Sequence, residues 1–259
     1  MYNFDHISGQ TFQIDDAKIY CEIIGNLDAP PLLMLHGGLG NIEDFNDIVP
    51  DLARDFKVIG IDSRGQGKST LGTQKLTYER IEKDVAGVLK KLSIRSLNIL
   101  GFSDGGIAAY RLAATNQLQI NRLVTIGSKW QLKNDDPNIS IFKKITAKSW
   151  REKFPETYDA YMRQNPNPDF DRLVPAIVNM WLDQTETGYP GGKVENISCP
   201  LLLIRGDDDH LVALQSIVDL RGIVKNAKFM NVAFAGHVAF EEQKNIVVST
   251  IKQFITQPL

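Results

Sequence analysis

Residues 97–106, with the sequence LNILGFSDGG, constrain the fold more than any other stretch of the chain. The apolar run LNIL has the length of a buried strand, and a helical pattern begins directly after the glycines. Ser103 therefore lies on the corner between a strand and a helix that nearly touch. Side chains two residues to either side would collide there, which explains Gly101 and Gly105. The pattern predicts a hydroxyl held clear of its own backbone, at a helix start that favours negative charge.

Short apolar strands alternate with amphipathic helices along most of the chain, which is typical of an α/β domain. An antiparallel hairpin is predicted at the sheet edge, over residues 12–14 and 18–24. Later strands are predicted over residues 32–35, 57–61, 97–100, 122–126, 200–205 and 227–232. One helix is expected after Asn41, one over residues 78–92, and a single last helix closes the chain. We therefore predict a single domain over residues 1–259.

Composition changes over residues 128–196, where all three tryptophans occur. We interpret this stretch as an insertion of several short helices, which forms a cap over the carboxyl edge of the sheet. The helices are expected to break at four prolines: Pro155, Pro166, Pro168 and Pro175. Trp130, Trp150 and Trp181 are expected to pack the cap on the core and, as a group, to wall a substrate pocket.

The charge balance favours a small-molecule partner. The chain has 29 Lys and Arg residues against 31 Asp and Glu, a net charge of -2, so we expect no binding to nucleic acid. The first ten residues lack a signal-peptide pattern, and no apolar run reaches membrane-spanning length. We therefore expect a cytoplasmic protein that does not enter the membrane, while nothing in the sequence indicates its oligomeric state.

No metal or cofactor site is predicted. Cys21 and Cys199 lie in predicted strands and belong to no C-x-x-C or Cys/His pattern, so we interpret them as buried free thiols. The glycine-rich turn over residues 62–69 lacks the spacing of phosphate-binding motifs and is interpreted as a structural loop.

Ser103 needs a base to become a good nucleophile, and the base needs a carboxylate to orient it. Among the four histidines, His237 is the predicted base because it lies on a late loop that follows a strand. His6 falls in an apparently unstructured start, and His36 is expected to stabilise its glycine turn. The acid is expected at a strand exit between serine and histidine, where three residues qualify: Asp207, Asp208 and Asp209.

Five motifs occur in order along the chain: His36-Gly37-Gly38, Asp62-x-Arg64-Gly65-x-Gly67-x-Ser69, Gly101-x-Ser103-x-Gly105, Gly206-x-x-Asp209 and Gly236-His237. In this order they resemble the motifs of the α/β-hydrolase superfamily, in which G-x-S-x-G forms the nucleophile elbow. The resemblance covers nearly the whole chain except the cap. It implies an α/β-hydrolase fold with a mostly parallel, eight-stranded sheet. It also implies a triad of Ser103, Asp209 and His237, because members carry the acid three residues after the glycine.

An oxyanion hole is expected from the backbone N–H groups of Gly38 and Asp104. Leu39 is a less favoured donor, and it is expected to contact the substrate. The Asp104 carboxylate has two interpretations. It is either an acid favoured by its position at a helix start, or a group that recognises a substrate amine, since Ser-Asp-Gly-Gly resembles the elbow of amino-acid ester hydrolases.

These features together predict a cofactor-free serine hydrolase that cleaves a small carboxylic ester or lactone through an acyl-enzyme. Two alternatives stay open. The same triad could serve a C–C or amide hydrolase or a lyase of similar fold, or the pocket could belong to a non-catalytic ligand-sensing protein.

Overall fold

A mixed sheet of eight strands forms the centre of the computed structural model, which describes residues 2–257. Its strands are β1 (Gln10–Ile14), β2 (Ala17–Gly25), β3 (Pro31–Leu35), β4 (Lys57–Ile61), β5 (Ser96–Phe102), β6 (Gln119–Ile126), β7 (Leu201–Gly206) and β8 (Ala227–Val232). Their spatial order is β1-β2-β4-β3-β5-β6-β7-β8. β2 runs antiparallel to β1 and β4, and the other neighbours are parallel. The expected fold class is confirmed.

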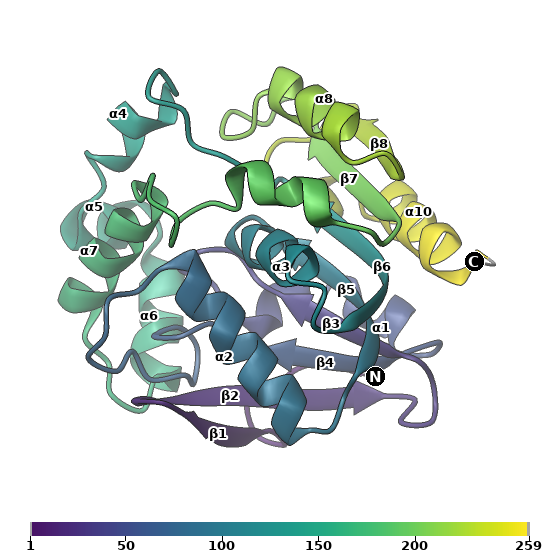
Figure 1. The fold of residues 1–259 in the computed structure, drawn as a ribbon. Coiled ribbons are helices and arrows are strands. Elements are labelled where there is room, and N and C mark those ends of the chain that lie inside the picture. The colour runs from purple at the N-terminus through teal and green to yellow at the C-terminus, as the bar shows by residue number, and fades with distance from the viewer. Residues whose placement is uncertain (1, 258–259) are drawn as a thin grey trace.

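Helices cover both faces of the sheet (Figure 1). The face with α2 (Tyr78–Lys91), α3 (Asp104–Ala114) and α8 (Leu214–Ile223) holds one core cluster. The other cluster includes η1 (Ile42–Phe45), α1 (Val49–Leu52), α9 (Ala239–Glu242) and α10 (Lys244–Thr256). Side chains alternate along β5, so Leu97 and Ile99 enter the first cluster and Leu100 and Phe102 the second. Within residues 2–257, none of these helices is long and apolar enough to cross a bilayer.

Two helices expected to be continuous are each divided in two. After Asn41, a 3-10 turn ends at Phe45 and a separate helix starts at Val49. Pro50 lies in the first turn of that helix, the position where a missing backbone N–H costs least. At the end of the chain, Gln243 leaves the helical conformation with φ -130° and separates α9 from α10.

The insertion between β6 and β7 forms α4 (Asn138–Phe142), α5 (Ala147–Lys153), α6 (Pro155–Gln164), α7 (Phe170–Trp181) and η2 (Gly191–Asn196). Figure 1 shows α4 to α7 grouped on one side of the sheet. Pro155 starts α6, and Pro166 and Pro168 fall between α6 and α7, as expected. The predicted break at Pro175 is wrong, because α7 continues through it. Pro175 is exposed, while Leu173, Val174 and Ile177 bury the opposite face, and this burial outweighs the lost hydrogen bond.

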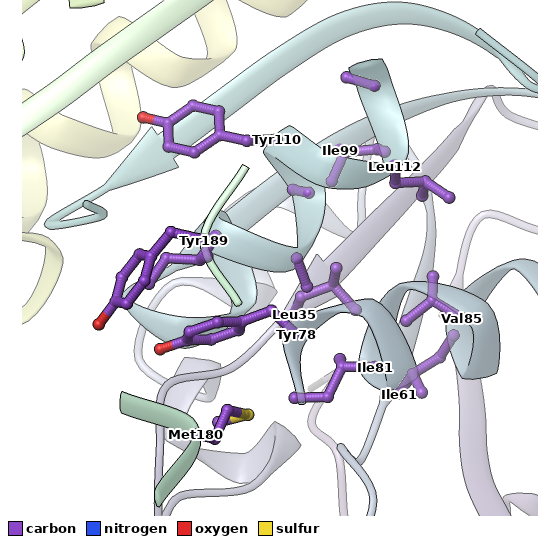
Figure 2. Close-up of a cluster of buried hydrophobic side chains, with 14 of the residues drawn as sticks. Leu35, Ile61, Tyr78, Ile81, Val85, Ile99, Tyr110, Leu112, Met180 and Tyr189 are labelled. Carbon is purple, nitrogen blue, oxygen red and sulfur yellow. The ribbon is translucent and has the colours of Figure 1, made fainter. Parts of the chain in front are cut away.

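The insertion shares its core with the sheet (Figure 2). Tyr78 and Ile81 of α2 pack with Leu35 of β3 in the first core cluster, which Met180 of α7 and the following Tyr189 join. The rings of Tyr78 and Tyr189 are 5.0 Å apart. The position of the cap is therefore fixed by the same apolar packing that holds α2 on the sheet.

Only Ser103 separates β5 from α3, and its backbone is strained, with φ 50° and ψ -117°. Its N–H donates to the carbonyl of Ile126, 2.9 Å away on β6. A Cβ at Gly105 would lie 2.1 Å from the carbonyl oxygen of Leu35, and one at Gly101 2.6 Å from Cα of Gly106. Gly101 thus allows β5 and α3 to approach closely, and Gly105 allows α3 to approach the end of the neighbouring strand β3.

His6 is not in an unstructured segment, contrary to expectation. Its ring is 3% exposed, with Nε2 2.8 Å from Asp62 Oδ2 and Nδ1 2.5 Å from Glu43 Oε1. Burial lowers the pKa of His6, but the hydrogen bonds and charges of Asp62 and Glu43 outweigh it and raise the pKa to about 9. Asp62 also accepts the backbone N–H groups of Ile42 and Lys68, so the 62–69 turn has a structural role as expected.

We predict that Ser103→Gly unfolds with a free energy about 1 kcal/mol higher than Ser103→Ala. Glycine adopts a positive φ without strain, whereas alanine keeps the Cβ that makes this conformation unfavourable. Urea unfolding of the two variants checks this difference. An alanine variant as stable as the glycine variant would show that the corner stores no strain.

The folded pKa of His6 also predicts how stability depends on pH. Because this pKa is about 9 against an ordinary 6.5, the contribution is fully present below pH 6.5 and is lost as the pH rises through 9. The loss is on the order of 3 kcal/mol at most. We expect the difference in unfolding free energy between wild type and His6→Gln to shrink over that interval. A difference that does not change with pH would contradict the buried, charged histidine.

Candidate active site

Three side chains from distant parts of the sequence meet at the carboxyl edge of the sheet. Ser103 follows β5, Asp209 follows β7 and His237 follows β8. Nε2 of His237 is 3.0 Å from Oγ of Ser103, and Nδ1 of His237 is 3.0 Å from Oδ2 of Asp209. Both distances are within hydrogen-bond range. The structure therefore brings together the three residues that the sequence analysis selected.

Asp209 is the one of the three adjacent acids that turns inward. It is 4% exposed, whereas Asp207 and Asp208 are exposed. Its Oδ1 accepts the backbone N–H groups of Leu211 and Val212, at 2.8 and 3.1 Å. Burial raises the pKa of Asp209, but the hydrogen bond and charge of His237 and these N–H groups lower it below its ordinary value. The carboxylate that orients His237 therefore stays ionised.

His36 holds the turn in which it lies. Its Nε2 accepts the backbone N–H of Ser63 at 2.9 Å, and Nδ1 donates to the carbonyl of Gly37 at 2.7 Å. The ring is fully buried, and burial lowers the pKa of His36, so the ring is neutral at neutral pH. Both ring nitrogens are occupied, as the structural interpretation of this histidine requires.

The glycine turn after β3 approaches the Ser103 corner closely. A Cβ at Gly37 would lie 3.3 Å from that of Ser103, and one at Gly38 would lie 2.4 Å from Oδ2 of Asp104. Gly38 and Asp104, the two predicted oxyanion donors, both border the cavity beside Ser103. A side chain larger than hydrogen at position 38 would clash with Asp104.

The Asp104 carboxylate is buried and held by two uncharged donors. The hydroxyl of Tyr78 donates to Oδ1 and the indole N–H of Trp181 to Oδ2, each at 2.7 Å. Burial raises the pKa of Asp104, and this effect outweighs the hydrogen bonds from Trp181 and Tyr78, which lower it. Tyr78 also borders the cavity beside Ser103, whereas the sequence analysis placed it only at the start of the helix predicted over residues 78–92. The sequence feature that could have identified Tyr78 is its hydroxyl group, which needs a hydrogen-bond partner when the side chain is buried.

A cavity of about 380 Å³ lies beside Ser103 and His237, within the size range of small-molecule sites. Its wall is mostly apolar and includes Ile107, Phe142, Ile145, Trp150, Trp181 and Val212. Lys129 also borders it and forms an ion pair with Asp136. Sequence reasoning missed Phe142, Ile145 and Lys129, because no motif marks the cap residues that meet the sheet edge.

Two residues predicted to contact substrate, Trp130 and Leu39, do not line this cavity. The indole N–H of Trp130 donates to the carbonyl of Ser216 on α8 at 2.9 Å, which turns the ring away from the cavity. Leu39 is 5% exposed and borders hollows beside α6 instead. We therefore leave Trp130 and Leu39 out of the inner cavity wall and keep Trp150 and Trp181.

No group of three His, Cys, Asp or Glu side chains within residues 2–257 is arranged to hold a metal ion. Cys21 lies in β2, and Cys199 lies just before β7 rather than inside it. Both are buried free thiols, and burial raises the pKa of each.

Comparison with known proteins shows the family to which this fold belongs. The model of the alpha/beta hydrolase fold family matches residues 30–174 and 128–244. Uncharacterized hydrolase YugF of Bacillus subtilis is 23% identical over 94% of this chain and 96% of its own length. Esterase YbfF of Escherichia coli is 25% identical over 87% of this chain and 92% of its own length.

A solved hydrolase structure from Pseudomonas aeruginosa superimposes with a TM-score of 0.79 at 20% identity, covering 98% of this chain and all of that one. This likeness extends over the sheet, its helices and the insertion. The family match spans most of the chain and includes the elbow at Ser103. The chain belongs to the α/β-hydrolase family.

Proposed function

We propose that this protein is a serine hydrolase that cleaves a small carboxylic ester or lactone through an acyl-enzyme. The observation that carries the proposal is the relay from Ser103 through His237 to Asp209, with both distances at 3.0 Å. Relatives named as esterase and hydrolase support the same reaction class. The mostly apolar cavity beside the serine suits the acyl group of a small ester.

The first half of the proposed reaction forms the acyl-enzyme. Nε2 of His237 takes the Ser103 proton as Oγ bonds to the carbonyl carbon. The N–H groups of Gly38 and Asp104 would donate to the oxygen that becomes negative, and each could contribute about 3 kcal/mol. When the tetrahedral intermediate collapses, the bond to the alcohol oxygen breaks, and His237 returns the proton to that oxygen.

The second half restores the enzyme. A water molecule gives a proton to His237 and bonds to the acyl carbon, and the new intermediate expels Oγ of Ser103, which regains its proton from His237. The acid product then leaves. Asp209 stabilises the protonated imidazole in both halves, and its low pKa keeps it ionised for this role.

Labelling with a fluorophosphonate probe tests the nucleophile. We expect labelling of the wild type, none of Ser103→Ala and strongly reduced labelling of His237→Ala, because the probe reacts only with an activated serine. Short p-nitrophenyl esters should be turned over by the wild type alone. Labelling that survives loss of Ser103 would remove the hydrolase proposal. Labelling at Ser103 without turnover of any ester would favour another scissile bond or a ligand-sensing role.

The three adjacent acids provide an internal control for the triad. We predict that Asp209→Asn lowers kcat by about 10⁴-fold, because the amide leaves His237 in the wrong tautomer. Asp207→Asn and Asp208→Asn change exposed carboxylates and should cost little. Steady-state kinetics with one p-nitrophenyl ester checks the ranking. A larger loss at position 207 or 208 would move the acid to that residue.

The interpretation of Asp104 as an amine-recognising group predicts a selective loss. Its buried carboxylate borders the cavity and is held by uncharged donors, so a substrate ammonium group beside it would favour its ionised form. Asp104→Asn should lower kcat/KM for alanine methyl ester about tenfold or more relative to methyl propionate, which lacks only the amine. An unchanged ratio would leave Asp104 with a structural role.

A further inference from the structure

A second hollow, of about 420 Å³, shares part of its wall with the cavity beside Ser103. We call this hollow the outer groove, and Leu39, Asn41, Glu43, Glu156, Thr157 and Ala160 line it. The cavity and the groove share four residues: Gly38, Asp44, Trp150 and Phe154. Gly38 is a proposed oxyanion donor, so the outer groove adjoins the reaction centre.

The two hollows differ in chemistry. Away from the groove, the cavity wall is mostly hydrocarbon, including Ile107, Phe142 and Ile145. Its buried cation, Lys129, is paired with Asp136, and its second cation, the exposed Lys153, lies over the ring of Phe154. The outer groove instead has amide, hydroxyl and carboxylate groups, and no described residue that lines it carries a positive charge. An apolar chain therefore gains free energy by burial in the cavity, whereas a hydrophilic group keeps hydrogen-bond partners in the groove.

The direction of proton transfer relates these hollows to the two halves of an ester. The leaving oxygen takes its proton from Nε2 of His237, so the alcohol half starts on the side of His237. Asp44 lies on that side: the next residue, Phe45, packs against Phe240 of α9, the helix that follows His237, with ring centroids 5.6 Å apart. Val238 borders the cavity there as well. A chain leaving past Asp44 enters the outer groove.

We propose, on the basis of the serine-hydrolase function above, that the cavity takes the acyl half of the substrate and the outer groove takes the alcohol half. The substrate class is an ester of an apolar acid with an extended, hydrophilic alcohol that carries no negative charge. Thr157 and Ala160 lie one turn apart on α6 and both line the groove. They therefore limit the size of the alcohol.

Butyrate esters of methanol, 1-hexanol and diglycerol test this assignment, because only the alcohol half changes. The wild type should have a higher kcat/KM for the diglycerol ester than for the hexyl ester. Ala160→Trp fills the groove and should lower kcat/KM for the diglycerol ester about tenfold or more relative to the methyl ester. Asp159→Trp adds the same side chain at an exposed position of α6 outside the groove and should leave that ratio unchanged.

Ile145→Trp provides the opposite change, since Ile145 borders only the cavity. It should reduce activity on methyl octanoate relative to methyl butyrate and keep the alcohol preference of the wild type. Circular dichroism spectra and thermal unfolding like those of the wild type show that each variant is folded.

Three results would overturn the assignment. The wild type could prefer the hexyl ester to the diglycerol ester. Ala160→Trp could leave the ratio of diglycerol to methyl ester activity unchanged, or it could change the preference between octanoate and butyrate esters instead. A wild type that is inactive on every ester and is not labelled by fluorophosphonate at Ser103 would overturn the proposed function, and the assignment with it. The first three outcomes leave Ser103 reactive, so the two failures can be told apart.

Discussion

The hydrogen bond between Oγ of Ser103 and Nε2 of His237 depends on the register of the whole central sheet. The two residues are 134 positions apart in the chain. They meet because β5 pairs with β6, β6 with β7 and β7 with β8, all in parallel, so that the carboxyl ends lie at one edge. Strand pairing thus brings residues that are distant in the sequence into contact. The strained corner at Ser103 directs the hydroxyl toward that edge.

The cap is fixed at the same edge by polar contacts as well as packing. Trp181 of α7 donates to Asp104 at the first turn of α3, and Asn165 at the end of α6 donates to the carbonyls of Gly67 and Ser69. These contacts connect the insertion to the elbow and to the 62–69 loop. Because the cap supplies most of the apolar wall, its position determines the shape of the space beside the nucleophile.

Much of the fold could be predicted because its signals are local. The strand over residues 57–61 and the strand over residues 227–232 have the predicted bounds, and the corner at Ser103 follows from its flanking glycines. The predicted helix break at Pro175 was wrong, because burial of the apolar face of α7 outweighs the backbone hydrogen bond that proline removes. His6 was misplaced because its two carboxylate partners are far away in the sequence.

The candidate site was predictable to the same extent. The convergence of Ser103 and His237 follows from strand exits, but residues alone left three acids open, and burial of Asp209 distinguishes it from its neighbours. The orientation of the Trp130 ring could not be predicted from the sequence, because it is set by a hydrogen bond to the carbonyl of Ser216, which is distant in the chain. Cap walls assembled from short helices without motifs can be found only from the structure.

Trapping the covalent intermediate tests the central claim most directly. The protein would be mixed with p-nitrophenyl butyrate, quenched in acid during turnover, digested and analysed by peptide mass spectrometry. The proposed mechanism predicts a butyryl group on Ser103 in the wild type and none in Ser103→Ala. Turnover without an adduct at Ser103, or an adduct on another residue, would contradict it.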